Sequence, residues 1–207
     1  MKPMDIERRS FEIIAQELGE RTIDPENDLV VRRVIHTTAD FDYYDNLVFS
    51  EHAVTRLREA IAQGADIVTD TTMAQAGINK RALAKFGGEV HCFIADEDVA
   101  AEARARGVTR SLVSMEKAAR MTDKPLVFAI GNAPTALFSL CDLVNAGKLR
   151  PAVIIGVPVG FVNVVEAKEQ VMRLPVPYIV ARGRKGGSNV AAAIVNAAVY
   201  QLSEREE

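Results

Sequence analysis

Histidines and clustered cations are the side chains of this sequence best suited to acid–base or anion-binding chemistry. A helical wheel puts the apolar residues of 30–35 on one stripe and His36 nearly opposite, in the last turn of a predicted helix. The carbonyl end of a helix favours an imidazolium at that position. His36 is therefore a candidate proton donor, and an idle surface histidine is the alternative. His91, inside an apolar run, is expected to be a hydrogen-bonded core residue, and His52 to lie on the surface.

A cationic loop follows the last apolar run. It holds Arg182, Arg184 and Lys185, with glycines at 186–187 ahead of a predicted helix that starts at Ser188. Guanidinium groups, free backbone amides and a helix dipole together suit a carboxylate or a phosphate. A solvated loop is the plain alternative. The GxxxxGK[ST] order of a Walker A loop is absent, so the glycines alone do not indicate a nucleotide.

Hydroxyl and amide side chains complete the set of candidates. Thr71 follows the first predicted strand and Asn132 follows the third, while Ser10 interrupts the apolar stripe of the first predicted helix. Ligands bind beyond the carboxyl ends of the strands in open α/β sheets, so Thr71 and Asn132 would line a pocket. A helical serine can also simply bond to its own backbone, and spacing alone favours that interpretation of Ser10.

The elements that must position these residues alternate between short apolar runs and helix-length amphipathic segments. Five short apolar runs lie at 66–69, 90–94, 126–130, 152–155 and 178–181. Most are continuously apolar, which is typical of strands covered on both faces. Helices are expected at 79–86, 97–106, 111–121, 134–146, 163–173 and 188–202. This rhythm predicts a three-layer α/β/α fold around a five-stranded parallel sheet with the flavodoxin-like strand order 2-1-3-4-5.

Helices are also expected ahead of the sheet, at 4–18, 24–37 and 51–62. Asp24 and Pro25 would start the second and Ser50 the third, as cap and first-turn residues. The segment Asp40–Tyr44 has no obvious core position. We expect one domain over residues 1–207, with a helical part at about 4–62 and a sheet part at about 63–202.

Composition excludes several classes of protein. The 207 residues carry 25 Lys+Arg and 28 Asp+Glu, a net charge of −3, so we expect no nucleic-acid partner. The charged N-terminus and interrupted apolar runs argue against a signal peptide or a membrane partner. Cys92 and Cys141 lack CxxC spacing, which fits reduced thiols in a cytoplasmic protein. No metal-ligand cluster is evident, and the sequence calls for no cofactor.

Six blocks, in order and without large insertions, resemble the precorrin-8X (cobalt-precorrin-8) methylmutase family. They are Ile6–Ile14, Arg32–Asp40, Asp70–Ile78, Thr109–Ser111, Ile130–Leu137 and Gly183–Ser188, and the likeness runs from about residue 4 to 202. Each block alone is weak, but six in succession are highly specific.

The resemblance implies an isomerase of corrin (vitamin B12) biosynthesis. It would move a methyl group from C-11 to C-12 of precorrin-8X or cobalt-precorrin-8, a formal 1,5-sigmatropic shift without a methyl donor, giving hydrogenobyrinate or cobyrinate. By the same resemblance His36 is the catalytic histidine that protonates the ring nitrogen next to the migration site. Ser10, Arg33, Thr71 and Arg110 fall on pocket positions, and the family implies a homodimer with shared active sites.

A carboxylate-ringed macrocycle needs several well-separated cations, which gives the Arg182 and Arg184 loop a purpose as a substrate-binding element. Two rival functions remain open at this point. A tetrapyrrole carrier would use the same arginines but would have no need of an acid at position 36. A flavin- or nucleotide-binding protein is favoured only by the predicted sheet topology, which is a poor guide to function.

Overall fold

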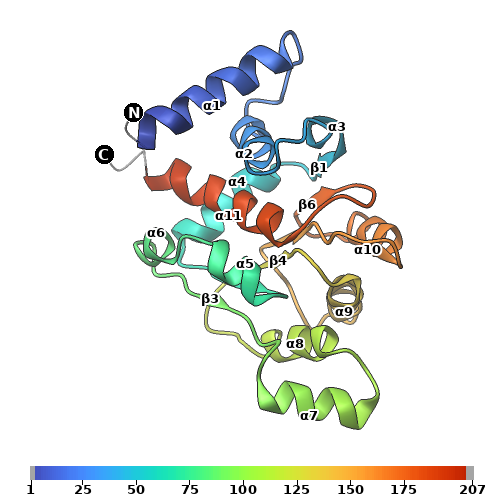
Figure 1. Ribbon diagram of the computed structural model, residues 1–207. Helices are drawn as coiled ribbons and strands as arrows, with labels where there is room; N and C mark the ends of the chain where they lie inside the picture. Colours follow the sequence, from blue (N-terminus) through green and yellow to red (C-terminus); the bar gives the residue numbers. More distant parts are fainter. Residues whose placement is uncertain (1–2, 204–207) are drawn as a thin grey trace.

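A six-stranded sheet forms the centre of the computed structural model, which describes residues 3–203 (Figure 1). The strands are β1 (Leu47–Phe49), β2 (Asp66–Thr69), β3 (Val90–His91), β4 (Leu126–Ile130), β5 (Val153–Gly156) and β6 (Tyr178–Ala181). They lie in the order β1-β6-β5-β4-β2-β3. β2 to β6 are parallel, in the predicted relative order, and β1 is antiparallel to β6.

The prediction of a five-stranded, fully parallel sheet is wrong, because the sheet has an additional short edge strand, β1, which is antiparallel. β1 has three residues, pairs Leu47 with Ala181 and Phe49 with Ile179, and follows a polar, aromatic segment, so no apolar run marks it in the sequence. β3 is also shorter than expected, because only Val90 and His91 pair with β2 at the opposite edge. The fold is therefore an α/β fold with a mixed, mostly parallel sheet.

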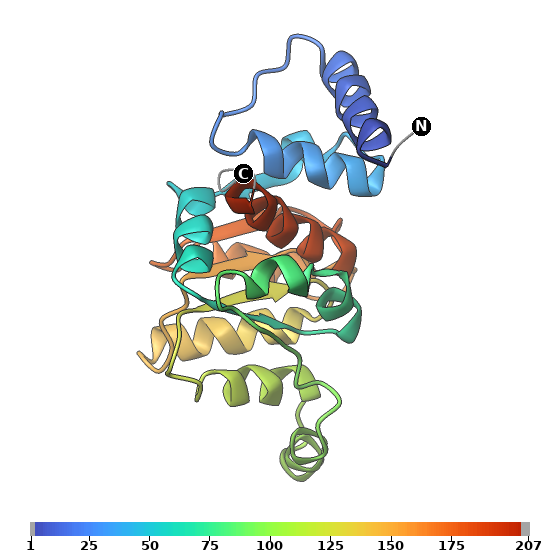
Figure 2. The same ribbon diagram turned by 90° about the vertical axis from the view of Figure 1, so that its left-hand side faces the viewer.

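Eleven helices lie within residues 3–203, and most of them form layers on the two faces of the sheet (Figure 2). They are α1 (Pro3–Leu18), α2 (Asp28–Thr38), α3 (Tyr43–Asn46), α4 (Ala53–Ala62), α5 (Thr72–Gly77), α6 (Lys80–Ala84), α7 (Glu97–Arg106), α8 (Arg110–Ala118), α9 (Pro134–Asn145), α10 (Val164–Val171) and α11 (Ser188–Ser203). The short α3 and α5 were not predicted. No helix in this range is long and apolar enough to span a membrane.

Two apolar cores, one on each face, explain why the strands are apolar throughout. Ile67 and Val127 pack with α4 and α11, whereas their neighbours Val68 and Phe128 pack with α8 and α9. All four are completely buried. Successive strand residues point to opposite faces, so both sets must be apolar when helices cover both sides.

The starts of α2 and α4 differ from the prediction. Asp24 does not cap a helix, because its Oδ1 accepts the N–H of Glu26 in a local turn at 2.8 Å. Ser50 accepts the N–H of Tyr178 instead of capping α4. The α4 N-terminus is served by the Glu26 carboxylate, which accepts the Thr55 N–H at 2.9 Å, and this bond lowers the pKa of Glu26. Both helices therefore begin later than the cap residues suggested.

The N-terminal part of the chain divides into buried and outlying elements. The prediction that Asp40–Tyr44 lacks a core position is wrong, since Tyr43 is only 3% exposed and Phe41 and Tyr44 pack on the core. α1 packs on α2 and lies outside the layers that cover the sheet (Figure 2). Its residues Ile6 and Ile13 are 53% and 41% exposed. An apolar stripe of α1 thus faces solvent.

Candidate active site

The loops after β2 and β4 are tied together by one buried carboxylate. Asp70 accepts the N–H groups of Gly131, Asn132 and Ala133 at 2.9, 2.8 and 2.6 Å. Burial raises the pKa of Asp70, and the three amide donors act in the opposite direction by stabilising the charged form. The backbone of the loop that carries Asn132 is thereby fixed to the end of β2, with the Asn132 side chain exposed.

Thr71 joins this edge to the start of α11. Its hydroxyl accepts the Ala74 N–H at 3.0 Å and lies 2.8 Å from the hydroxyl of Ser188. Gly131 lets the start of α11 approach the loop after β4, because a Cβ at position 131 would lie 2.6 Å from the Ser188 Cα. The structure thus brings the predicted residues Thr71 and Asn132 to one place at the carboxyl ends of the strands.

The three cations of the loop after β6 have different partners. Arg182 pairs with Glu169 at 3.1 Å, while Arg184 lies over the ring of Phe161 at 5.4 Å and makes no ion pair with any described residue. Lys185 pairs with Asp40 and Asp42 at 2.6 and 2.5 Å. Both carboxylates raise the pKa of Lys185. Lys185 therefore anchors the loop, and Arg184 remains the cation most available to a ligand.

His36 lies where the wheel placed it, on the exposed side of α2 opposite four buried residues of the same helix. Its ring stacks on Phe11 of α1, with centroids 5.4 Å apart and planes inclined by 17°. Within the described part of the chain, the imidazole makes no hydrogen bond. Stacking fixes the plane of the ring while both nitrogens remain open to a ligand.

Arg33 and Ser10 are engaged within the helical layer near His36. The Arg33 guanidinium pairs with Glu7 at 2.8 Å and lies over the rings of Phe11 and Tyr200 at 5.5 and 4.8 Å. Its Nε is buried without a hydrogen-bond partner. The Ser10 hydroxyl donates to the Ile6 carbonyl at 2.9 Å, the helical back-bond that the spacing favoured. Phe11 thus connects Arg33 with His36.

A hollow of about 360 Å³ lies between the end of α2 and the cationic loop. Its lining comprises Thr37, Thr38, Asp40, Tyr43, Val159, Lys185, Gly186 and Asn189. His36 adjoins this set in sequence but is not part of the lining. Arg110, at the start of α8, is exposed, and its side chain makes no hydrogen bond or ion pair within residues 3–203.

The site residues fall into two groups in one chain. Ser10, Arg33 and His36 lie on α1 and α2, and Thr71 and Asn132 lie at the sheet edge. No hydrogen bond or ion pair between described residues joins the two groups. Arg110, Arg182 and Arg184 lie on further loops and helix ends.

Sequence reasoning missed Phe11 and Asp70, which orient His36 and the Asn132 loop. Asp70 directly follows an apolar strand, a position at which a carboxylate commonly contacts the next loop, so this signal was available. Phe11 occupies an ordinary helical position. Its stacking depends on how α1 meets α2, which spacing within one helix cannot give.

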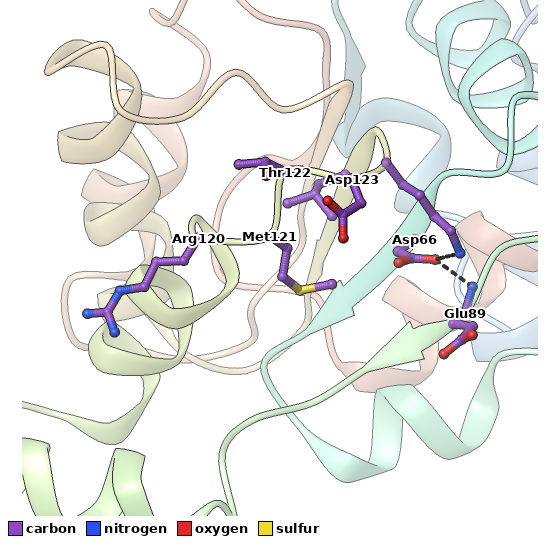
Figure 3. Close-up of a pocket in the computed structure, with 8 residues that line it drawn as sticks. Asp66, Glu89, Arg120, Met121, Thr122 and Asp123 are labelled. Atoms are coloured by element: carbon purple, nitrogen blue, oxygen red, sulfur yellow. Dashed lines mark hydrogen bonds and ion pairs between the residues drawn. The ribbon is translucent and has the colours of Figure 1, made fainter.

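A second hollow, of about 330 Å³, lies at the opposite end of the sheet (Figure 3). There the Asp66 carboxylate accepts the Glu89 N–H at 2.8 Å and lies 3.1 Å from the Lys124 ammonium and 3.2 Å from His91 Nε2. Burial acts to raise the pKa of Asp66, but these partners outweigh it and lower the pKa overall. His91 has the expected hydrogen-bond partner, although its side chain is 24% exposed rather than part of the core.

The third histidine and the two cysteines lie outside both hollows, since none of them is among the lining residues. His52 is exposed, as expected, with Nδ1 3.2 Å from a Glu26 oxygen. Cys92 and Cys141 are free thiols, and burial raises the pKa of Cys141 to about 11. Across residues 3–203, no group of three or more His, Cys, Asp or Glu side chains is placed to hold a metal ion.

Comparison with known proteins gives matches over nearly the whole chain. The family described as precorrin-8X methylmutase matches residues 5–201. A cobalt-precorrin-8 methylmutase of Salmonella typhimurium is 46% identical, over 98% of this chain and 97% of the relative. A precorrin-8X methylmutase of Pseudomonas aeruginosa is 41% identical, over 93% of this chain and 92% of the relative.

The fold matches equally well. A crystal structure titled as precorrin-8x methyl mutase from Thermus thermophilus superposes with a TM-score of 0.88 and 39% identity, covering 97% of this chain and 98% of the other. The similarity therefore includes α1 and α2 as well as the sheet.

Proposed function

The chain belongs to the precorrin-8X methylmutase family, and on this premise we propose that it moves a methyl group from C-11 to C-12 of precorrin-8X or cobalt-precorrin-8. It is a methylmutase, an intramolecular transferase of cobalamin biosynthesis. In the proposed reaction one C–C bond breaks and one forms within a single molecule, giving hydrogenobyrinate or cobyrinate, so no methyl donor or oxidant is needed. The 46% identity over 98% of the chain carries the proposal.

We assign the proton donor as His36. Protonation of the ring nitrogen beside the migration site withdraws electrons from the macrocycle and lowers the barrier to migration. A placed general acid contributes about 10²- to 10⁴-fold in rate. The exposed imidazole, oriented by Phe11 and without a hydrogen-bond partner among the described residues, supports this role. Holding one conformer of the substrate and excluding water supply further acceleration.

We propose that the peripheral acetate and propionate groups pair with the arginines. Arg184 and Arg110 are exposed and need give up no ion pair with a described residue. Arg182 and Arg33 would exchange Glu169 and Glu7 for substrate carboxylates. Thr71 and Asn132 would contribute neutral hydrogen-bonding groups at the same edge of the sheet.

We also propose that two copies of the chain form a homodimer with shared active sites. The exposed Ile6 and Ile13 of α1, which project outside the layers covering the sheet, form an apolar stripe that a second copy would cover. The Asp40–Tyr44 segment gives no support, because it packs on its own core. Sedimentation at micromolar concentration tests this assembly.

We place the reaction in the cytoplasm, where the free thiols Cys92 and Cys141 would stay reduced, and we propose no resident cofactor. The corrinoid intermediate is the proposed small-molecule partner, and neither nucleic acid nor membrane enters the mechanism.

The test is to mix the purified protein with metal-free and with cobalt-loaded precorrin-8 and record visible spectra over time. Methyl migration changes the conjugation, so new bands should grow with turnover for the natural form of the substrate. A carrier would give an immediate, stoichiometric shift without turnover. That result, or no change with either form, would contradict the proposal.

A further inference from the structure

Lys168 on α10 is a buried cation for which the mechanism above has no use. The residue is fully buried, and no carboxylate among the described residues pairs with it. Its Nζ donates to two backbone carbonyls, those of Gly183 and Lys185, both at 2.8 Å. Burying an ammonium without a counter-ion is costly. The two carbonyls belong to the cationic loop and flank Arg184.

The backbone of this loop is fixed from a second side as well. The Gly160 N–H donates to the Arg184 carbonyl at 3.1 Å, and the Gly187 N–H donates to the Val157 carbonyl at 2.9 Å. Gly186 is pressed against the loop after β5, since a Cβ there would lie 2.1 Å from the Val157 oxygen. The loop at 183–187 is therefore held in one conformation by the loop after β5 and by the two hydrogen bonds that Lys168 donates.

We propose that Lys168 is a positioning residue for substrate binding, which holds the carbonyls of Gly183 and Lys185 so that Arg182 and Arg184 meet the peripheral carboxylates of the substrate. This inference rests on the proposed function. Lys168 acts through the loop and touches no substrate atom. Its charge adds to the positive potential beneath the arginines, which the binding of a polyanion would use.

The state of the ammonium changes within an accessible pH range. Burial lowers the pKa of Lys168 to about 8. The neutral amine still has two N–H groups for the two carbonyls, but the charge is lost. Other ionisable groups on its own helix and on the elements packed against it are Glu166, Glu169, Cys141, Asp142, Tyr178, Arg182, Arg184 and Lys185.

The expected consequence concerns substrate affinity rather than chemistry. Lys168→Met keeps a long side chain but removes both hydrogen bonds and the charge. Displacing a charge-assisted contact costs about 10- to 100-fold in affinity. KM should rise by that factor, with kcat within about threefold. Amide hydrogen exchange over residues 183–187 should become faster. Lys80→Met, an exposed lysine without a hydrogen bond or ion pair among the described residues, is the matched control.

Wild-type KM measured between pH 7 and 9.5 provides a second test, whose first readout needs no variant. It should rise as the pH passes about 8, and the rise should disappear in Lys168→Arg, whose charge persists. An unchanged KM with unchanged exchange in Lys168→Met would overturn the proposal. A flat wild-type KM would reject the contribution of the Lys168 charge to substrate binding. If the wild-type protein does not catalyse methyl migration, the proposed function is refuted instead. The comparison of amide hydrogen exchange would still decide whether Lys168 holds the loop.

Discussion

The two ends of the sheet carry hollows of similar size, and the histidine near each of them has different partners. The hollow at the amino ends of the parallel strands has a volume of about 330 Å³. The Asp66 carboxylate there already has a backbone amide, a lysine and a histidine as partners. The hollow where α2 meets the cationic loop has a volume of about 360 Å³, and Lys185 there is paired as well. The side chains of the nearby Arg184 and His36 have no hydrogen-bonding partner among the described residues. An exposed imidazole without a side-chain hydrogen bond among the described residues therefore distinguishes the proposed site from the amino end, where His91 is bonded to Asp66.

The largest expected effect lies at His36. His36→Ala should leave the fold intact, since the side chain is exposed opposite the buried stripe of α2. Turnover should fall by about 10²- to 10⁴-fold, the loss of a general acid, with substrate binding retained. His91→Ala, at the amino end, is the matched control and should keep near-native turnover. Comparable turnover in the two variants would remove the functional distinction between the ends.

The next effect lies in the cationic loop. Arg184→Ala should weaken substrate binding by about 1.5–3 kcal/mol, the value of a charge-assisted contact. Arg182→Ala should cost less, because Arg182 must first leave Glu169. Titration of binding by absorbance measures both. Native affinity in both variants would remove the carboxylate-binding role from this loop.

At the amino end the expected loss is in stability rather than activity. Asp66→Asn should lower the free energy of unfolding by about 1–2 kcal/mol, because it weakens hydrogen bonds to a buried charge. The pKa of Asp66 is lowered in the folded state, so its contribution is present above the unfolded pKa and is lost as pH falls through the folded value. Urea unfolding at pH 7 and in acid should therefore show the variant approaching wild type at low pH. Reduced turnover of the folded variant would contradict the assignment.

The smallest effect is expected at Lys124. The side chain is 37% exposed, so its ion pair with Asp66 is screened by solvent. Lys124→Met should destabilise by about 0.2–1 kcal/mol, without a change in turnover. A loss larger than that of Asp66→Asn would show that the amino end depends on this cation and not on the buried carboxylate.

The parts of the fold that the sequence predicts are those set by local periodicity. The strands at 66–69, 126–130 and 178–181 and the helix at 97–106 have the predicted bounds, because burial on two faces or one leaves a clear pattern. The late starts of α2 and α4 were missed because Asp24 and Ser50 bond elsewhere. A cap residue in the sequence does not reveal which amide it will serve.

The same distinction applies to the site. The wheel placed His36 correctly, because its exposure depends only on α2. Phe11 and Lys168 act across elements distant in the sequence, so periodicity carries no signal for them. Lys185 of the cationic loop is held by Asp40 and Asp42, residues 145 and 143 positions away. Long-range pairing of this kind depends on the folded chain.

The most direct test of the His36 assignment is the pH dependence of methyl migration at saturating substrate, in wild type and in His36→Ala. Saturation removes the effect of Lys168 on KM, so the profile reports the chemical step. Wild-type turnover should fall as pH rises, because the acid form of a proton donor is depleted in alkaline solution. The residual turnover of His36→Ala should not show this fall at high pH. A flat wild-type profile, or the same fall in the variant, would contradict the role of His36 as the proton donor.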